Sequence, residues 1–387
     1  MRPRYEVSLE ELARDPHPVL ARLRERAPVC WVSALGAWLV SGYSAAVEVL
    51  LDPATFTVDD PRFTTARVTG PSMLSLDGQS HARHRGPFTH SFRPAGLSKH
   101  LAGFARAEAA RLTDAIRPAG QSELRTTVAG PLAAAVMAEA LGLSEAGVTP
   151  CTVLSWYRDI VAAVAAISAA TTGSPSAVRV GSFDALAAGL REAIAAGRAP
   201  VLTEAAGSGE LTEREVISNA AVLLFGGIET TEGMICNTVL HLLSHPAQLG
   251  LVSADPGLLP AAVEESLRLE PAAAVVDRYA TRDVSIGDAD IRRGDPVTVS
   301  LAGANRDPAV FPEPDRYDIR RPNSARHLAF ARGPHFCLGA HLARMEATEA
   351  VTTMLGGLPG LALDPEQPSA TYGLIFRKPT ALRVRWG

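Results

Sequence analysis

The sequence has few cysteines and no long apolar run. Its cysteines are scattered over 387 residues without the spacing of a disulfide framework, at positions Cys30, Cys151, Cys236 and Cys337. This pattern predicts a reducing compartment. The first residues lack the apolar core of a signal peptide, and no segment reaches the roughly 18 apolar residues of a membrane span. We therefore expect a soluble, cytoplasmic protein that does not use a membrane.

A surplus of charge of either sign is also missing. The 37 basic and 41 acidic side chains leave a formal net charge of −4, which argues against a nucleic-acid partner. Lysine is nearly absent, because Lys99 and Lys378 are the two lysines of the chain and arginine supplies the remaining positive charge. Internal repeats are absent, and a composition that is 47% apolar can fill a large core. We expect residues 1–387 to form a single domain.

One cysteine follows a glycine- and proline-containing run and directly precedes a helical pattern. The run is Phe330-Ala-Arg-Gly-Pro-His-Phe, then Cys337, and the helix starts near Ala340. At a helix N-terminus, unpaired backbone N–H groups and the helix dipole favour thiolate over thiol. Such a thiolate is suited to bind haem iron.

Two other interpretations of Cys337 stay open on local grounds. A buried free cysteine is most often a small apolar side chain. A zinc site formed with His335 and His341 is disfavoured, because it lacks a fourth ligand and a second cysteine at CxxC spacing.

Histidine and arginine stand four residues apart in the segment 77–86, where we predict that a helix begins. His81 and Arg85 then lie on one face of this helix and suit a carboxylate ligand. A solvated basic face is the alternative.

Thr212 and Glu215 form a predicted capping box, and from there an apolar helix runs to about Ser244 and crosses the core. Two adjacent glycines, Gly226 and Gly227, interrupt its middle at a cost of about 1 kcal/mol each. Close approach of another group, or local opening of the helix, explains them.

A carboxylate and a hydroxyl follow these glycines. Glu229 and Thr230 can relay protons from solvent to a bound ligand. The alternative is that Gly226 and Gly227 serve helix packing and that Glu229 is simply exposed.

The stretch 330–339, together with Leu342-Ala-Arg, resembles the haem-ligand loop of the cytochrome P-450 superfamily. Ala331 stands where that family usually has glycine, a mild change if the backbone φ there is negative. The resemblance implies haem b with Cys337 as the axial thiolate and metal ligand. Residues that match cofactor-binding positions are His81, Arg85, Gly227, Arg278, Phe330, Gly333, His335, Cys337 and Gly339.

The resemblance also assigns roles outside the loop. Glu229 and Thr230 match an acid–alcohol pair beside bound O2, with Gly226 replacing the more common alanine. Glu265, Arg268 and Arg316 match a structural triad of charged residues that, in the family, fixes the loop carrying the cysteine. The fold it implies is mainly α with small β-sheets, as one domain with a long central helix across the haem.

The elements that we expect are easily listed. Helices are predicted near 9–14, 18–26, 43–51, 98–116, 128–141, 150–170, 175–196 and 212–244, and strands near 29–32, 38–41, 124–127, 284–286 and 297–300. We also expect a C-terminal hairpin joining 373–379 to 382–386. By resemblance, the helices 150–170 and 175–196 and the loop 171–175 between them cover the substrate pocket.

The resemblance implies a monooxygenase that hydroxylates, or otherwise oxidises, a hydrophobic small molecule with O2. No GxGxxG fingerprint follows a strand, so electrons come from a separate ferredoxin and ferredoxin reductase, which we expect to dock near Arg93, Arg332 and Arg344. Two alternatives are a biosynthetic or peroxide-driven enzyme that performs desaturation, epoxidation or coupling, and a non-catalytic haem-binding protein. Candidate substrate-pocket residues are Leu224, Gly226, Val275, Leu374 and Ile375.

Overall fold

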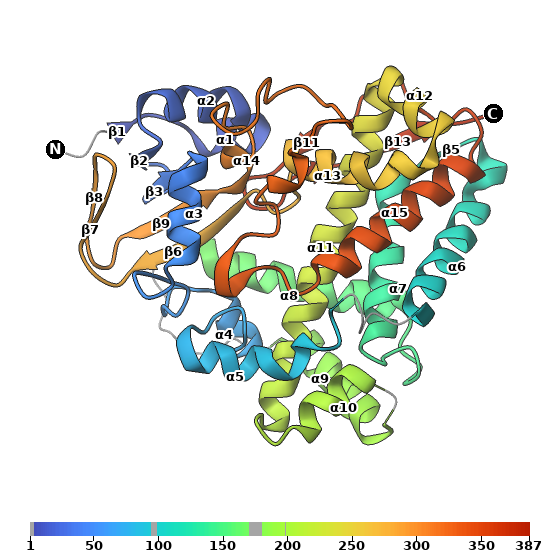
Figure 1. Ribbon diagram of the computed structural model, residues 1–387. Coiled ribbons are helices and arrows are strands. Elements are labelled where there is room, and N and C mark those ends of the chain that lie inside the picture. Colours follow the sequence, from blue (N-terminus) through green and yellow to red (C-terminus); the bar gives the residue numbers. More distant parts are fainter. Residues whose placement is uncertain (1–3, 94–98, 170–179, 198) are drawn as a thin grey trace.

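The computed structural model describes residues 4–93, 99–169, 180–197 and 199–387 (Figure 1). The largest sheet lies on one side of the molecule, and the longer helices lie on the other. The helices are α1 Leu9–Arg14, α2 Pro16–Arg26, α3 Tyr43–Leu51, α4 Thr65–Thr69, α5 Gly78–Thr89, α6 Lys99–Ile116, α7 Gly130–Ala140, α8 Pro150–Ala169, α9 Gly181–Ala195, α10 Pro200–Gly207, α11 Glu213–Ser244, α12 Pro246–Ala254, α13 Leu259–Leu269, α14 Leu301–Ala304 and α15 Ala340–Gly357.

The strands are short and form four sheets within the described residues. They are β1 Arg4–Tyr5, β2 Val29–Val32, β3 Ala37–Val40, β4 Phe56–Thr57, β5 Gln121–Glu123, β6 Val275–Ala280, β7 Val284–Ile286, β8 Ala289–Ile291, β9 Pro296–Ser300, β10 Ala362–Leu363, β11 Thr371–Tyr372, β12 Lys378–Pro379 and β13 Arg383–Arg385. The six-stranded sheet has the order β1-β2-β3-β9-β6-β4, and the smaller ones are β10-β13-β5, β11-β12 and β7-β8.

Side chains alternate between the two faces of the large sheet. Leu39, Thr298 and Asp277 are register partners on neighbouring strands and share one face. Val297 and Arg278, one position along each strand, lie on the opposite face. Because alternate residues of one strand point in opposite directions, β6 presents different side chains to two different environments.

The predicted long helix is confirmed as α11, which has 32 residues and crosses the interior (Figure 1). The Thr212 side chain accepts the backbone N–H of Glu215, whose carboxylate accepts the backbone N–H of Thr212, so the capping box is also confirmed. The helix is continuous through Gly226 and Gly227. Local opening of the backbone is therefore not the reason for the two glycines.

Most other predicted helices are present with boundaries close to those expected, but the predicted strand at 124–127 is wrong. The strand β5 ends at Glu123, and residues 125–129 form a single π-helical turn. The Glu123 carboxylate accepts the backbone N–H groups of Arg125 and Thr126, at 3.0 and 2.9 Å. A carboxylate in this position caps a helical turn instead of extending a strand.

The predicted C-terminal hairpin is also wrong. Strand β12 pairs with β11, whereas β13 pairs with β5 and β10 in a different sheet. Buried Arg377 draws the preceding turn away from β13, because its guanidinium donates to Glu270 at 2.9 Å and to the carbonyl of Ala13 at 2.7 Å. The predicted roof loop at 171–175 lies outside the described residues, although the flanking helices α8 and α9 pack against each other.

No helix in the described part of the chain combines the length and the apolar character that crossing a membrane requires.

A buried ion-pair cluster connects α13 to the segment before the cysteine loop. Both guanidinium nitrogens Nε and Nη2 of Arg268 lie 2.8 Å from the Glu265 carboxylate, and both side chains are fully buried. The third member is Arg321, whose Nε lies 2.9 Å from Glu265. The sequence-based assignment of Arg316 is wrong, because its side chain is 58% exposed and pairs with Glu313 at 3.1 Å.

The different environments of Arg321 and Arg316 yield a direct test. We expect Arg321→Ala to lower the free energy of unfolding by about 3–5 kcal/mol, because it leaves Glu265 with less compensation for its buried charge. Arg316→Ala serves as the matched control and should cost under about 1 kcal/mol, since exposed pairs contribute little. Denaturant titrations of both variants provide the measurement. Equal destabilisation by the two changes would contradict the assignment.

Candidate functional site

The loop that carries Cys337 folds back on itself and ends at a helix N-terminus. The backbone N–H of Cys337 donates to the carbonyl of Phe330 at 2.9 Å, which closes the loop. Residues 333–335 form a 3₁₀ turn inside it, and Gly339 is the N-cap of α15. The sulfur therefore lies directly before α15, where the sequence predicts it.

Gly333 allows this loop to dock against α3. Its φ is +72°, and a Cβ at this position would lie 2.5 Å from the carbonyl oxygen of Leu50. Both the left-handed backbone and the close approach require a residue without a side chain. In contrast, nothing lies within 4 Å of a Cβ built at Gly339, so the surrounding protein leaves free space beside the start of α15.

Ala331 is strained. Its φ is +56°, in the left-handed region that non-glycine residues enter at a cost of roughly 1–2 kcal/mol. The expectation of a mild substitution required a negative φ at this position and is wrong. The loop keeps the glycine-type conformation even though the sequence supplies alanine.

Replacing this alanine should therefore stabilise the protein. We expect Ala331→Gly to raise the free energy of unfolding by about 1 kcal/mol, because glycine removes the strain but also gains freedom in the unfolded chain. Ala329→Gly, two residues earlier and without a positive φ, should instead destabilise by about 0.5–1 kcal/mol. Denaturant titration measures both variants. A loss of stability with Ala331→Gly would show that the left-handed conformation is not retained.

The groups around Cys337 act on its ionisation in opposite directions. Burial raises the pKa of the Cys337 thiol, whereas the backbone N–H of Gly339 and the charges of Arg85 and Arg344 lower it. Arg344 is not available for a partner protein, because its guanidinium pairs with the Glu264 carboxylate and stacks over Phe330 at 4.4 Å. This finding removes Arg344 from the expected ferredoxin-docking surface.

Helix α5 lies against the cysteine loop through three side chains. The rings of His81 and His335 have centroids 4.3 Å apart, and Arg85 Nη2 donates to the carbonyl of Phe336 at 2.7 Å. Asp77, the N-cap of α5, accepts from His335 Nε2 at 2.7 Å and also from the Thr57 hydroxyl. Burial opposes the charge of Asp77, but these hydrogen bonds lower its pKa overall. The structure thus brings together His81, Arg85 and His335 as expected.

Two guanidinium groups at this site have no carboxylate close enough, among the described residues, to balance their charge. Arg85 donates to one carbonyl, and buried Arg278 donates through Nη1 to the carbonyl of Asp277 at 2.7 Å. Among the described residues, neither has a carboxylate within ion-pair distance, and burial lowers the pKa of both. The buried Nε2 of His81 also has no hydrogen-bond partner among the described residues. An anionic ligand with carboxylate groups would satisfy all three, so the residues present fit a haem with its propionates.

The chain is similar to known proteins over almost its whole length. It is 34% identical to the cytochrome P450 monooxygenase PikC of Streptomyces venezuelae, over 97% of this chain and 92% of that protein. The sequence model of cytochrome P450 matches residues 256–358. The chain belongs to the cytochrome P450 family. It is thus an enzyme of the P450 monooxygenase class, and the family implies haem bound through a cysteine thiolate.

Two further relatives agree with this assignment. Nocardicin C N-oxygenase of Nocardia uniformis subsp. tsuyamanensis is 33% identical over 97% of this chain and 97% of that protein. The crystal structure of the hydroxylase HmtN, which is involved in himastatin biosynthesis, superposes with a TM-score of 0.82 at 33% identity and covers 97% of this chain and 98% of that one. The predicted fold, mainly α with small sheets, is thereby confirmed.

In this P450, the two glycines of α11 have different surroundings. A Cβ at Gly227 would lie 2.3 Å from the sulfur of Met137 on α7, whereas one at Gly226 would meet nothing within 4 Å. Gly227 therefore allows close packing of α11 against α7, and its place in the cofactor site stays a prediction. Gly226 is the position that faces open space.

The acid–alcohol pair of this P450 is held in place by its neighbours. The Thr230 hydroxyl donates to the carbonyl of Gly226. Glu229 accepts from the hydroxyl of Tyr157 on α8 and lies 2.7 Å from Nζ of Lys378 on β12. The same Nζ lies 2.6 Å from Glu232, one turn further along α11. The interpretation of Glu229 as an exposed side chain is wrong, because only 15% of it is exposed.

Sequence reasoning missed Tyr157, Glu232 and Lys378. The signal that was available is the rarity of lysine, since a chain that uses arginine almost everywhere keeps Lys378 at this point. A carboxylate three residues after Glu229 was a second signal, because positions i and i+3 share a helix face.

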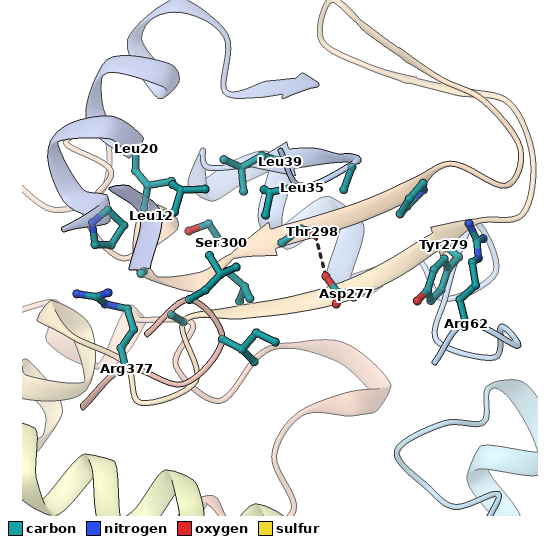
Figure 2. A pocket seen from close by; sticks show the side chains of 18 residues that line it. Leu12, Leu20, Leu35, Leu39, Arg62, Asp277, Tyr279, Thr298, Ser300 and Arg377 are labelled. Atoms are coloured by element: carbon teal, nitrogen blue, oxygen red, sulfur yellow. Dashed lines mark hydrogen bonds between the residues drawn. The ribbon is translucent and has the colours of Figure 1, made fainter. Parts of the chain in front are cut away.

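The candidate substrate-pocket residues separate into two groups. Val275, Leu374 and Ile375 line one cavity of about 290 Å³ beside the large sheet (Figure 2). Leu224 is only 1% exposed and belongs to the apolar core, so its assignment to the pocket is wrong. Gly226 does not line this cavity.

Proposed function

We propose that this P450 uses haem b with Cys337 as axial ligand to oxidise a hydrophobic small molecule with O2. The observation that carries the proposal is that Arg85 and Arg278 have no carboxylate partner among the described residues, and that Arg85 contacts the loop whose thiol, Cys337, lies at a helix N-terminus. When bound, the haem supplies the activation of O2. The chain supplies the ligand, the charges that hold the propionates and the path for protons.

The proposed roles of the chain follow from the geometry. Arg85, Arg278 and His81 would bind the propionates. Among the described residues, neither arginine has a carboxylate partner and the buried Nε2 of His81 has no hydrogen-bond partner. Burial, followed by the charges of His335 and Arg85, lowers the pKa of His81 to about 4. This residue is therefore a neutral hydrogen-bond donor at neutral pH. Gly333 and the Phe330 carbonyl fix the loop that carries Cys337, which would hold the haem through its sulfur.

Protons would reach the reacting oxygen through α11. Glu229 lies between Tyr157 and Lys378, and the hydroxyl of Thr230 is the next polar group along the helix. The Lys378 ammonium and the Tyr157 hydroxyl together fix the orientation of the Glu229 carboxylate. Thr230 would hold a proton donor in the open space beside Gly226, and Glu229 would resupply it.

The substrate and the electron donors are the finer parts of the proposal. The names of two relatives, a hydroxylase and an N-oxygenase, show that family members oxidise different kinds of atom. Electrons would come from a separate ferredoxin and its reductase, and exposed Arg93 remains a candidate contact for an acidic partner. Residues 1–387 as a single domain, and a cytoplasmic location, stay predictions from the sequence.

The ligand assignment is tested by removing the sulfur. We expect Cys337→Ser to abolish the Soret band that is characteristic of thiolate-bound, reduced, CO-bound haem, because an alcohol does not donate electron density to iron as a thiolate does. Cys151→Ser, at an exposed cysteine on α8, is the control and should leave the band unchanged. Retention of the thiolate band by the Cys337→Ser variant would contradict the proposal.

The proton path is tested by a matched pair of threonines on α11. Thr230 and Thr238 each donate a hydroxyl hydrogen bond to the carbonyl four residues earlier. We expect Thr230→Ala to slow productive turnover by about 10²-fold, the lower end of what positioned proton transfer contributes, and to divert reducing equivalents to hydrogen peroxide. Thr238→Ala should have little effect on either the turnover rate or the release of hydrogen peroxide.

The measurement is hydrogen peroxide released per electron consumed, with purified ferredoxin and reductase. If the two variants release equal amounts, Thr230 has no special role. Turnover driven by added peroxide that is undiminished in Thr230→Ala would identify the enzyme as peroxide-driven.

A further inference from the structure

The cavity of about 290 Å³ has one face of the large sheet as its floor (Figure 2). Register pairing places Leu39, Thr298 and Asp277 side by side on adjacent strands β3, β9 and β6. Ser300 and Val275 form the next pair along the same face. The floor therefore changes from apolar on β3 to polar on β9 and β6.

Apolar side chains form most of the remaining wall. Leu12 and Leu20 reach the cavity from α1 and α2, and Leu35 from the β2–β3 turn (Figure 2). Leu374 and Ile375, from the turn between β11 and β12, close another side. A ligand in this space would be surrounded mainly by aliphatic carbon, with its polar contacts restricted to the floor.

The two arginines that line the cavity are already neutralised. Arg62 Nε lies 2.7 Å from Asp60, and its guanidinium stacks over Tyr279 at 4.3 Å. Arg377 is buried and pairs with Glu270 at 2.9 Å. Neither positive charge is available to compensate an acidic group elsewhere in the cavity.

Asp277 is that acidic group. Its Oδ1 accepts the hydroxyl of Thr298 at 2.7 Å, and this is the one hydrogen bond to its carboxylate within the described residues. Arg278 donates to the main-chain carbonyl of Asp277 and lies on the other face of the strand. Burial raises the pKa of Asp277, against the opposing effects of Thr298 and Arg278. The Asp277 side chain is nevertheless exposed to solvent in the cavity. Among the described residues, no positively charged side chain forms an ion pair with its carboxylate.

We propose that this cavity binds the cationic end of an otherwise apolar ligand, and that the Asp277 carboxylate is its counter-charge. An amine or a quaternary ammonium group near Asp277 restores the missing positive charge, and aliphatic carbon fits the leucine-lined wall. The volume is close to the lower end of the roughly 300–1,000 Å³ found for small-molecule sites. The cavity therefore accommodates a small ligand or one end of a larger one.

Strand β6 lies between the cavity and the proposed haem site. Strand β6 presents Asp277 to the cavity and Arg278 to the opposite face, where the propionates would bind. We infer that the ligand is a substrate with a basic group, held by that group while its apolar part extends past Val275 and Ile375. This step rests on the proposed function, whereas cation binding by Asp277 does not.

The test is a calorimetric titration of the haem-loaded full-length protein with octyltrimethylammonium, which has no free electron pair to bind iron. We expect the unmodified protein to bind this cation about fivefold more tightly than Asp277→Asn, because an ion pair at an exposed carboxylate contributes up to about 1 kcal/mol. 1-Octanol, with the same chain and no charge, should bind equally to both proteins.

Asp290→Asn is the matched control variant. Asp290 also accepts a cross-strand hydroxyl, from Ser285 at 2.9 Å, but on the β7–β8 hairpin and away from the cavity. The affinity of the Asp290→Asn variant for the cation should equal that of the unmodified protein. Equal binding of octyltrimethylammonium by the unmodified protein and Asp277→Asn would overturn the proposal. If Asp277→Asn does not fold, binding of 1-octanol or octanoate to the unmodified protein as tightly as the cation would overturn it.

The substrate inference has its own readout. Octyltrimethylammonium should shift the haem Soret band of the unmodified protein and not that of Asp277→Asn, and calorimetric binding without any shift would overturn the substrate assignment alone. Failure of the proposed function would show separately, as an unchanged thiolate band in Cys337→Ser.

Discussion

A fully buried carboxylate, Glu265, determines where the cysteine loop can lie. It is compensated by Arg268 and Arg321, and Arg268 also donates to the carbonyls of Asn305 and Pro314. The Asn305 side chain in turn accepts the backbone N–H of Leu328, at the start of the cysteine loop. A continuous series of hydrogen bonds therefore joins α13 to the loop. Because a buried charge is costly to leave unpaired, this geometry is tightly constrained.

Charge compensation also explains the organisation of the proposed haem site. Asp77 holds His335 against α5, while Arg85 and Arg278 remain without carboxylate partners in the described part of the chain. In this part of the structure the acidic side chain of Asp77 is used for a structural contact, whereas Arg85 and Arg278 have no such contact with a carboxylate of the described residues. The strained Ala331 belongs to the same arrangement, because the loop must turn at this point to meet α3 through Gly333.

The sheet and the long helix carry chemistry on more than one side. Alternation along β6 separates Asp277 from Arg278, so that one strand contributes both to the proposed cation-binding cavity and to the proposed haem site. On α11, the side chain of Met137 fills the space beside Gly227, whereas the space beside Gly226 is open. Adjacent residues in one motif can therefore have unrelated roles, and the motif alone does not separate them.

The sequence by itself determined the local features: the capped helix α11, the cysteine at the start of α15, and the pairing of Glu265 with Arg268. These depend on residues close in the chain, through capping, i/i+3 contacts and turn geometry. Only the tertiary structure decided which distant groups meet. It selected Arg321 over Arg316, placed Lys378 on Glu229, and divided the expected C-terminal hairpin between two sheets. Such contacts depend on burial and on long-range register, and neither is encoded in the spacing of nearby residues.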